Sequence, residues 1–331
     1  MLMPLRISLS LFYRLYLEAG GPGARSPKRG RSGARVISVG NLEAGGGGKT
    51  PCAAAIAMEV IRRGGRPAVV SRGHGGEASG SGGTLVLEPG RGADPSDVVS
   101  LAGDEAMIYL DRSIPLVIDR DRARGVDEAV RSIDPTHVIL DDAFHRTGIV
   151  KDLDILLLDA ERPFGSGRLL PAGTLREPPG AVRRADAVVF TRADGDEVPA
   201  EALDLVEGKP VFFARHVFDG LYDSEGAEVD PLPLRREHTV LFSGIARHGS
   251  FETLAVESGL EPDVSVRFDD HHVYSGDDAR FIRSLGGERS VFVTTAKDWY
   301  KAASLFEGAS LLRMDMRMEI EGLEELVGSA G

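Results

Sequence analysis

The chain has 331 residues, of which 42% are hydrophobic and 27% are charged, a composition typical of a globular protein with one large or two medium-sized domains. Its net charge of −12 gives no overall basic field and argues against nucleic acid as a main partner. The single cysteine, Cys52, excludes an internal disulfide and suits a reducing cytosol. We expect it to be a small packing residue.

The first 35 residues depart from this acidic average, because they carry seven Lys and Arg side chains against one acid, Glu18. Their apolar side chains can share one broad helical face, with Arg6 and Arg14 outside its centre. The apolar run is too short and too interrupted to span a bilayer. We therefore expect residues 1–30 to form a basic amphipathic helix on an anionic membrane surface. A helix packed against the rest of the protein is an equal alternative on these residues alone.

Beyond this segment, continuous apolar runs alternate with helical stretches. This pattern predicts an α/β fold with a parallel sheet that helices bury on both faces. Strands are expected at Val36–Val39, Pro67–Ser71, Ile114–Asp119, His137–Leu140, Asp154–Leu158, Ala187–Phe190 and Val211–Phe213. Helices are expected at Pro51–Arg63, Asp104–Asp111 and Arg122–Ile133, with a mobile glycine-rich loop at Gly73–Gly83.

A second α/β series follows an acidic, proline-bearing segment. Its expected elements are strands at Thr239–Phe242, Val264–Phe268 and Val291–Thr294, helices at Phe251–Ser258, Asp277–Leu285 and Asp298–Leu305, then a strand at Leu311–Met316 and a helix at Ile320–Val327. We expect a first domain over 31–218, a linker over 219–236 and a smaller α/β domain over 237–310. Residues 311–331 are expected to return to the first domain.

The run Gly45-Gly46-Gly47-Gly48-Lys49-Thr50 lies between the first strand and its helix. Consecutive glycines let several backbone N–H groups converge on one anion. Lys49 can neutralise β- and γ-phosphate oxygens, and Thr50 can ligate Mg²⁺. The run therefore predicts a nucleoside triphosphate site, against the alternative of a flexible glycine linker. Glu43 stands where a standard phosphate loop has its first glycine, so the spacing instead matches the GGxGKT loops of partner-positioning ATPases and small-molecule kinases.

Carboxylates suited to the chemistry around such a loop occur at two further places. Asp141 and Asp142 end an apolar strand, and in P-loop proteins such a strand lies beside the phosphate-loop strand and its acid holds Mg²⁺. Capping of the next helix by this pair is the alternative. Asp104 opens a predicted helix and by default is an N-cap. A phosphotransferase acting on an alcohol, however, needs a base near the hydroxyl, and Asp104 is a candidate.

Four further segments leave their roles open. Asp269-Asp270-His271-His272 could bind a transition metal, orient or share protons with an Asp base, or form a surface turn. The arginine-rich segments 162–168 and 176–178 carry groups suited to phosphate charge, or form a surface loop. Thr191-Arg192-Ala193-Asp194 is only a weak match to the base-reading N-K-x-D of GTPases, because Asn and Lys are missing.

Taken in order, these strings resemble the tetraacyldisaccharide 4′-kinases of lipid A biosynthesis. The matching strings are Val39-Gly40-Asn41-Leu42, the glycine loop with Pro51, Ser71-Arg72-Gly73, Gly103-Asp104-Glu105, Leu140-Asp141-Asp142-Ala143-Phe144, Asp152-Leu153-Asp154, Arg162-Pro163-Phe164-Gly165, Gly167-Arg168-Leu169-Leu170-Pro171-Ala172-Gly173, Leu175-Arg176-Glu177-Pro178, Arg184-Ala185-Asp186-Ala187, Phe242-Ser243-Gly244-Ile245-Ala246, Asp270-His271-His272 and Thr294-Thr295-x-Lys297-Asp298. Each string alone is weak evidence, but the ordered set is specific.

The resemblance implies transfer of the γ-phosphate of ATP to the 4′-hydroxyl of a lipid-linked glucosamine disaccharide, tetraacyldisaccharide 1-phosphate. It also implies a P-loop α/β domain, a smaller C-terminal α/β domain and a peripheral N-terminal helix at the cytoplasmic face of the bacterial inner membrane. The implied roles are phosphate and Mg²⁺ binding for Lys49 and Thr50, an acidic metal-side pair for Asp141 and Asp142, a base for Asp104, its paired histidine for His271, and active-site arginines for Arg122 and Arg168.

The chain departs from the family pattern at four places. His145 replaces a glutamine and Ala143 a glycine in the common D-D-G-F-Q-H-R string, His74 replaces a tyrosine, and Ala106 follows Gly-Asp-Glu where proline is frequent. None removes the implied base, lysine or metal acids. Two rival functions remain at this point: a membrane-associated P-loop ATPase that switches protein partners, and a GTPase or metallochaperone. The first lacks its signature second loop lysine, and the second has a degraded N-K-x-D.

Overall fold

The computed structural model describes residues 33–91, 94–287 and 289–328. The expected amphipathic helix over 1–30 lies outside these residues. Within the described ranges, no helix is both long enough and apolar enough to cross a membrane.

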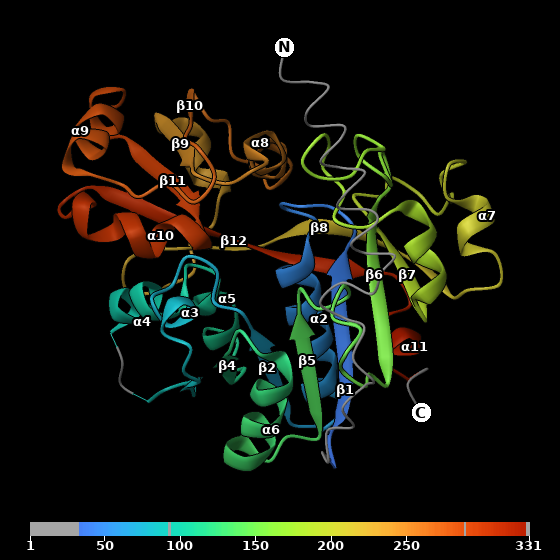
Figure 1. Cartoon of the computed structure of the whole chain (residues 1–331). Coiled ribbons are helices and arrows are strands. Elements are labelled where there is room, and N and C mark those ends of the chain that lie inside the picture. The colour runs from blue at the N-terminus through green and yellow to red at the C-terminus, as the bar shows by residue number, and fades with distance from the viewer. Residues whose placement is uncertain (1–32, 92–93, 288, 329–331) are drawn as a thin grey trace.

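Twelve strands form one sheet in the order β10-β9-β11-β12-β8-β7-β6-β1-β5-β2-β4-β3 (Figure 1). The strands are β1 (Arg35–Asn41), β2 (Pro67–Ser71), β3 (Leu85–Leu87), β4 (Leu116–Ile118), β5 (His137–Asp141), β6 (Leu153–Asp159), β7 (Ala187–Thr191), β8 (Val211–Tyr222), β9 (Thr239–Ser243), β10 (Val264–Arg267), β11 (Val291–Thr295) and β12 (Ser310–Ile320). Only the β3–β4 and β8–β12 pairs of this described sheet are antiparallel. The expected mostly parallel α/β fold is therefore confirmed.

Helices cover both faces of the sheet. They are α2 (Lys49–Arg62), α3 (Ala78–Ser81), α4 (Pro95–Ala102), α5 (Ala106–Leu110), α6 (Arg122–Ile133), α7 (Leu203–Val206), α8 (His248–Glu257), α9 (Gly276–Ser284), α10 (Ala296–Ala302) and α11 (Leu323–Gly328), with 3₁₀ turns at Pro179–Arg184, Leu232–Arg236 and Ala303–Phe306. Alternate strand residues face opposite cores. Ile37 of β1 packs in the cluster that contains Ile56 of α2, whereas its neighbour Val36 packs in the cluster that contains Val126 of α6.

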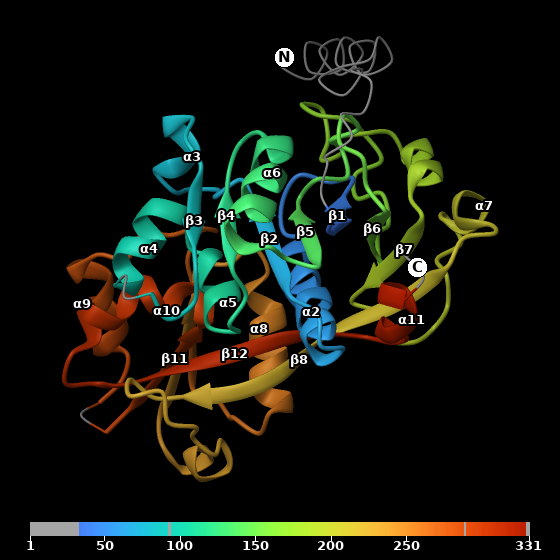
Figure 2. The same cartoon turned by 90° about the horizontal axis from the view of Figure 1, so that it is seen from below.

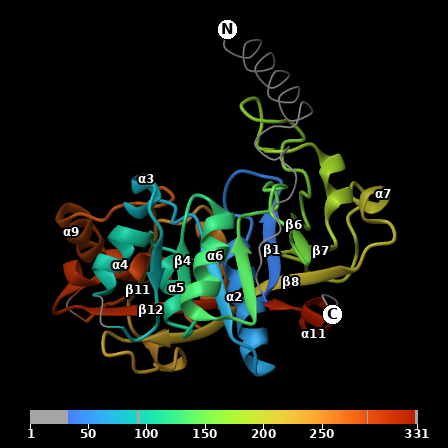
Figure 3. The same cartoon turned by 60° about the horizontal axis from the view of Figure 1, so that its bottom comes forward.

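Two long strands connect the halves of the molecule. β8 and β12 pair from Tyr222 with Arg313 to Ala214 with Ile320, with one shift of register between Asp315 and Met316. They run side by side between the β1–β7 part and the β9–β11 part (Figures 1 and 2). The helices α9 and α7 lie at opposite ends of the molecule along this direction (Figure 3).

Several boundaries differ from the sequence expectations. β8 continues to Tyr222, so the expected linker from residue 219 begins inside a strand. β12 continues to Ile320, where a helix was expected to start, and the helix α11 begins at Leu323. The glycine-rich loop contains the short helix α3. The division of this continuous sheet into two domains stays a proposal.

Candidate active site

The glycine loop joins β1 to α2, in the strand–loop–helix order that the sequence predicts. Gly48 has a φ of 79° and stands directly before the first helical residue, a backbone conformation that favours glycine. A Cβ at Gly47 would collide with the amide of Asn41. The loop thus folds back onto Asn41 at the end of β1. This close approach explains why residue 47 is a glycine.

Lys49 folds back over the loop. Its Nζ donates a 2.9 Å hydrogen bond to the carbonyl of Gly45 and lies 3.9 Å from Asp142 Oδ1. Gly45–Gly48, Lys49 and Thr50 all line one cavity of about 1450 Å³. The Lys49 ammonium is therefore held over the loop by one carbonyl oxygen and one distant carboxylate. A bound phosphate can replace both contacts.

Asp141 stands at the end of β5, which pairs with β1 as expected for a metal-side strand. Its Oδ2 accepts hydrogen bonds from Thr50 Oγ1 at 3.0 Å and from Tyr109 at 2.8 Å. Its Oδ1 is buried and has no hydrogen-bond partner among the described residues. Burial and the charge of Asp142 raise the pKa of Asp141. A buried, unpartnered carboxylate oxygen beside a threonine hydroxyl is a donor set that fits Mg²⁺.

Asp142 has a different environment from its neighbour. Its φ of 54° turns the chain sharply, and Arg176 Nη1 lies 2.8 Å from both of its carboxylate oxygens. Burial opposes ionisation of Asp142, but the charges of Lys49 and Arg176 lower its pKa. Asp142 is thus already paired with cations, whereas Asp141 is not.

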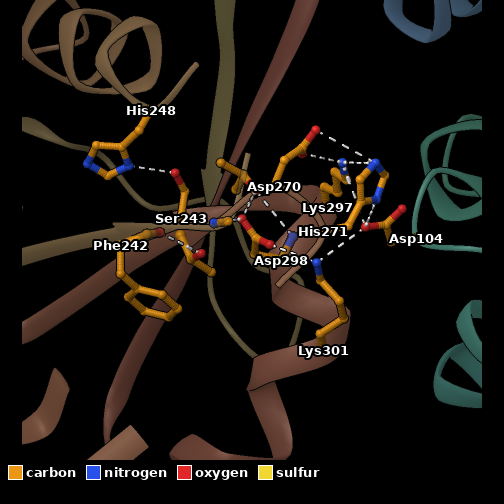
Figure 4. Close-up of polar contacts among 12 residues, drawn as sticks. Asp104, Phe242, Ser243, His248, Asp270, His271, Lys297, Asp298 and Lys301 are labelled. Carbon is orange, nitrogen blue, oxygen red and sulfur yellow. Dashed lines mark hydrogen bonds and ion pairs between the residues drawn. The ribbon is translucent and has the colours of Figure 1, made fainter. Parts of the chain in front are cut away.

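Asp104 and His271 meet across 167 residues of sequence, as Figure 4 shows. His271 Nδ1 lies 3.1 Å from Asp104 Oδ2, and Lys301 Nζ donates to the same oxygen at 3.2 Å. Asp104 Oδ1 is buried and has no hydrogen-bond partner in the described part of the chain. The side chain therefore does not cap α5, whose N-cap residue is Glu105.

The electrostatics of this pair follow from its contacts. Burial opposes the charged form of Asp104, but the hydrogen bond with His271 and two nearby lysine charges lower its pKa to about 2. The same hydrogen bond raises the pKa of His271. His271 lines the cavity, whereas Asp104 lies behind it and is only 7% exposed.

The two arginines expected in the site lie in different places. Arg122 lines the cavity, and its Nη2 donates to the carbonyl of Asp141 at 3.3 Å. Burial lowers its pKa to about 10, and its Nε has no hydrogen-bond partner among the residues described. Arg168 is exposed on the loop that precedes Leu175 and is not among the residues that line the described cavity. Its role stays a prediction.

The residues that suggested a metal site or a guanine site do not form such sites in the described structure. His272 stacks on Phe268 and lies 3.3 Å from Asp278, whereas His271 contacts Asp104. Among the described residues, no group of three or more His, Cys, Asp or Glu side chains is arranged to hold a metal ion. Asp194, the residue expected to read guanine, is exposed.

Four residues that lie around the expected carboxylates were not among the site residues expected from sequence, although Arg176 belongs to the arginine-rich segment 176–178. Burial and the charge of Asp141 raise the pKa of Glu105 to about 7, and Arg176, Tyr109 and Lys297 contact the expected carboxylates. Arg176 and Lys297 lie in strings that carry the family resemblance, and Glu105 directly follows Asp104. Tyr109 has no such signal, because only the fold brings its hydroxyl to Asp141.

Comparisons with known proteins agree on one family. A family model described as tetraacyldisaccharide-1-P 4′-kinase (LpxK) matches residues 1–330. The tetraacyldisaccharide 4′-kinase of Geobacter sulfurreducens is 41% identical over 275 residues, covering 81% of this chain and 75% of the relative. That of Geobacter metallireducens is 38% identical over 310 residues, covering 91% and 88%. The crystal structure of LpxK from Aquifex aeolicus in complex with ATP superimposes with a TM-score of 0.72 at 29% identity, covering 99% of this chain and 96% of that one.

Proposed function

Because the chain belongs to the tetraacyldisaccharide-1-P 4′-kinase family, we propose that it transfers the γ-phosphate of ATP to the 4′-hydroxyl of tetraacyldisaccharide 1-phosphate. The observation that carries this proposal is the Asp104–His271 pair at the edge of the cavity that the glycine loop also lines. The phosphate donor site thus lines the same cavity as the histidine that is hydrogen-bonded to the proposed proton acceptor, and an alcohol kinase requires a phosphate site with an acceptor close to it.

The glycine loop and Lys49 are proposed to hold the triphosphate. The amides of Gly45–Gly48 and the N-terminus of α2 supply fixed dipoles for the β- and γ-phosphates. Thr50 and Asp141 would hold Mg²⁺, with Asp142 beside them, and the ion would neutralise phosphate charge. Arg122 is proposed to stabilise charge on the transferring group, and Arg168, on an exposed loop, is proposed as a second arginine in this role.

Asp104, assisted by His271, is proposed to take the proton from the sugar hydroxyl. Its carboxylate is ionised, and its Oδ1 has no hydrogen-bond partner among the described residues and is free to accept a proton. The hydrogen bond from His271 holds Oδ2 and so orients the carboxylate. The hydroxyl oxygen then bonds to the γ-phosphorus while the bond to the β,γ-bridging oxygen breaks, and ADP leaves with that electron pair.

The acceptor carries acyl chains, so the enzyme must work where a bilayer holds its substrate. We propose that residues 1–30 form the basic amphipathic helix that places the protein on the cytoplasmic face of the inner membrane. The excess of Lys and Arg in the first 35 residues supports this proposal.

The test is transfer of phosphate from γ-labelled ATP to tetraacyldisaccharide 1-phosphate in detergent micelles, with the labelled lipid separated and its position of phosphorylation determined. We expect a 4′-phosphorylated lipid that requires Mg²⁺. Folded, ATP-binding protein that forms no such product would contradict the proposal, and ATP hydrolysis stimulated by a protein partner would favour the partner-switching ATPase instead.

A further inference from the structure

Helix α10 brings two lysines, one helical turn apart, to Oδ2 of Asp104, the oxygen that His271 also contacts (Figure 4). Lys301 Nζ lies 3.2 Å from Asp104 Oδ2, and Lys297 Nζ lies 3.7 Å from the same oxygen. Both lysine side chains are largely buried, at 14% exposed for Lys297 and 10% for Lys301. Oδ2 of Asp104 therefore faces three groups that can carry positive charge: His271, Lys297 and Lys301. An aspartate needs fewer cations than this to stay ionised.

The two lysines differ in what surrounds them. Lys301 is fixed: its Nζ lies 2.9 Å from Asp298 Oδ1 and over the ring of Tyr274. Lys297 lines the large cavity together with Lys49 and His271, whereas Lys301 is not among the residues that line it in the described structure. Lys301 is therefore a fixed positive charge next to Asp104 and outside the lining of the described cavity. Lys297 contacts Asp104 and also lines the cavity.

Lys297 has only long contacts in this position. Its Nζ lies 3.3 Å from Asp270 Oδ1 and 3.4 Å from His271 Nε2. By contrast, its backbone is anchored, because Thr295 caps α10 and Asp298 Oδ2 accepts a 2.8 Å bond from the amide of Gly244. A flexible four-carbon side chain on a fixed helix can therefore move its ammonium without moving the fold.

The phosphate loop supplies a single lysine, Lys49, and the second loop lysine found in related ATPases is missing. Transfer to a hydroxyl at Asp104 places the γ-phosphoryl group between the loop and that carboxylate. The Lys297 ammonium stands at the Asp104 end of this path. Charge that develops on the phosphoryl oxygens is best stabilised by a cation that is already desolvated.

We propose that Lys297 is a catalytic residue whose ammonium leaves Asp104 and binds the transferring phosphoryl group when both substrates are bound. This inference rests on the proposed kinase function. The lysine keeps its proton throughout and contributes only charge, so the bonds made and broken are those of the transfer itself. Its departure also uncovers Asp104, which lies behind Lys297 and His271, and so couples the arrival of phosphate to the availability of the base.

The electrostatics support this coupling. The charged groups that face Asp104 are His271 from the segment after β10, Lys297 and Lys301 from α10, and Glu105 beside it. Burial alone would lower the pKa of Lys297, but the carboxylates of Asp104, Glu105 and Asp270 raise it. The ammonium is therefore charged before it moves, and its departure makes Asp104 more basic.

The experiment measures single-turnover phosphate transfer to the detergent-solubilised acceptor in Lys297→Met, with Lys301→Met as the matched control from the same helix. We expect Lys297→Met to slow transfer about 10²- to 10³-fold while equilibrium binding of ATP changes by less than about threefold. Lys301→Met should slow transfer less than Lys297→Met does, because Lys301 is not among the residues that line the described cavity. Lys297→Gln, checked for folding by its melting temperature, serves if the methionine variant does not fold.

A double-mutant cycle separates a direct role from one that acts through His271. If Lys297 binds the phosphoryl group, Lys297→Met should slow transfer further in a His271→Ala background, because the two losses multiply. No further loss in that background, or wild-type transfer by Lys297→Met itself, would overturn the inference. Failure of the wild-type enzyme to phosphorylate the lipid at all would instead count against the proposed function.

Discussion

The hydroxyl of Tyr109 donates a 2.8 Å hydrogen bond to Asp141 Oδ2, the same oxygen that accepts one from Thr50. Both bonds fall on one side of the carboxylate and leave Oδ1 buried without a hydrogen-bond partner among the described residues. The tyrosine thus fixes which oxygen is presented to a cation. Groups that orient a metal ligand in this way commonly change metal affinity when they are removed.

We therefore expect Tyr109→Phe to raise the Mg²⁺ concentration for half-maximal kinase activity about 10- to 100-fold, with a smaller change in rate at saturating Mg²⁺. A Mg²⁺ titration of phosphate transfer measures this. Tyr222→Phe is the matched control, because the Tyr222 hydroxyl bonds the carbonyl of Asp219 and not a metal-side carboxylate. Equal Mg²⁺ requirements in Tyr109→Phe and wild type would show that Asp141 is oriented without the tyrosine.

Removal of the proposed base gives a second prediction. Asp104→Asn keeps the shape of the side chain but not its charge, and it should reduce phosphate transfer about 10²- to 10⁴-fold while ATP still binds. Because the pKa of Asp104 is lowered to about 2, the wild-type carboxylate is ionised throughout pH 5–8. An acidic limb in that range should consequently belong to another group. Loss of nucleotide affinity with unchanged turnover would contradict the role of Asp104 as base.

The phosphate site and the central strands were predictable because their signals are local. The glycine loop, its lysine and its threonine are contiguous, and β2 and α6 were placed to the residue from apolar runs and helical periodicity. The two carboxylates at the end of β5 follow from the same kind of run. Each of these features depends on neighbours in sequence and on which residues can be buried.

The long strands β8 and β12 were truncated in the sequence prediction for a physical reason. The half of β8 beyond Ala214 is only partly buried and carries Arg215 and His216, so it does not read as an apolar run. The region of β12 around Met314–Met318 alternates Met with charged residues, so it has no continuous apolar run of the kind from which the strands were predicted. Its period of two is instead typical of a strand exposed on one face. The pairing of β8 with β12 and the contacts of α10 with Asp104 join residues more than 90 positions apart in the sequence. No local sequence pattern predicts such contacts.

The pH dependence of stability should reflect a buried histidine outside the cavity. His248 is 5% exposed, and its two ring nitrogens each lie 2.6 Å from a serine hydroxyl, those of Ser243 and Ser265. Burial lowers the pKa of His248. The unfolded chain therefore binds a proton more readily than the folded one, and this contribution to stability is present above about pH 6.5 and is lost as the pH falls below it.

We expect the melting temperature to fall between pH 7.5 and pH 5.5, and to fall less steeply in His248→Gln. Differential scanning calorimetry at constant ionic strength measures both slopes. His238→Gln replaces an exposed histidine and is the matched control, expected to keep the wild-type slope. If His248→Gln and wild type lose stability in parallel on acidification, other groups set the pH dependence.

Membrane association should depend on the basic N-terminal segment. Deletion of residues 1–20 removes Arg6 and Arg14 together with the apolar residues expected on one helical face, so both the apolar and the electrostatic contributions to interfacial binding are lost. We expect the fraction that sediments with vesicles of anionic phospholipid to fall sharply, whereas ATP binding stays. Arg6→Gln with Arg14→Gln in the full chain should give an intermediate loss that high salt reproduces in the wild type, because salt screens only the charge contribution. A deleted protein that sediments like the full chain would place the membrane contact elsewhere on the molecule.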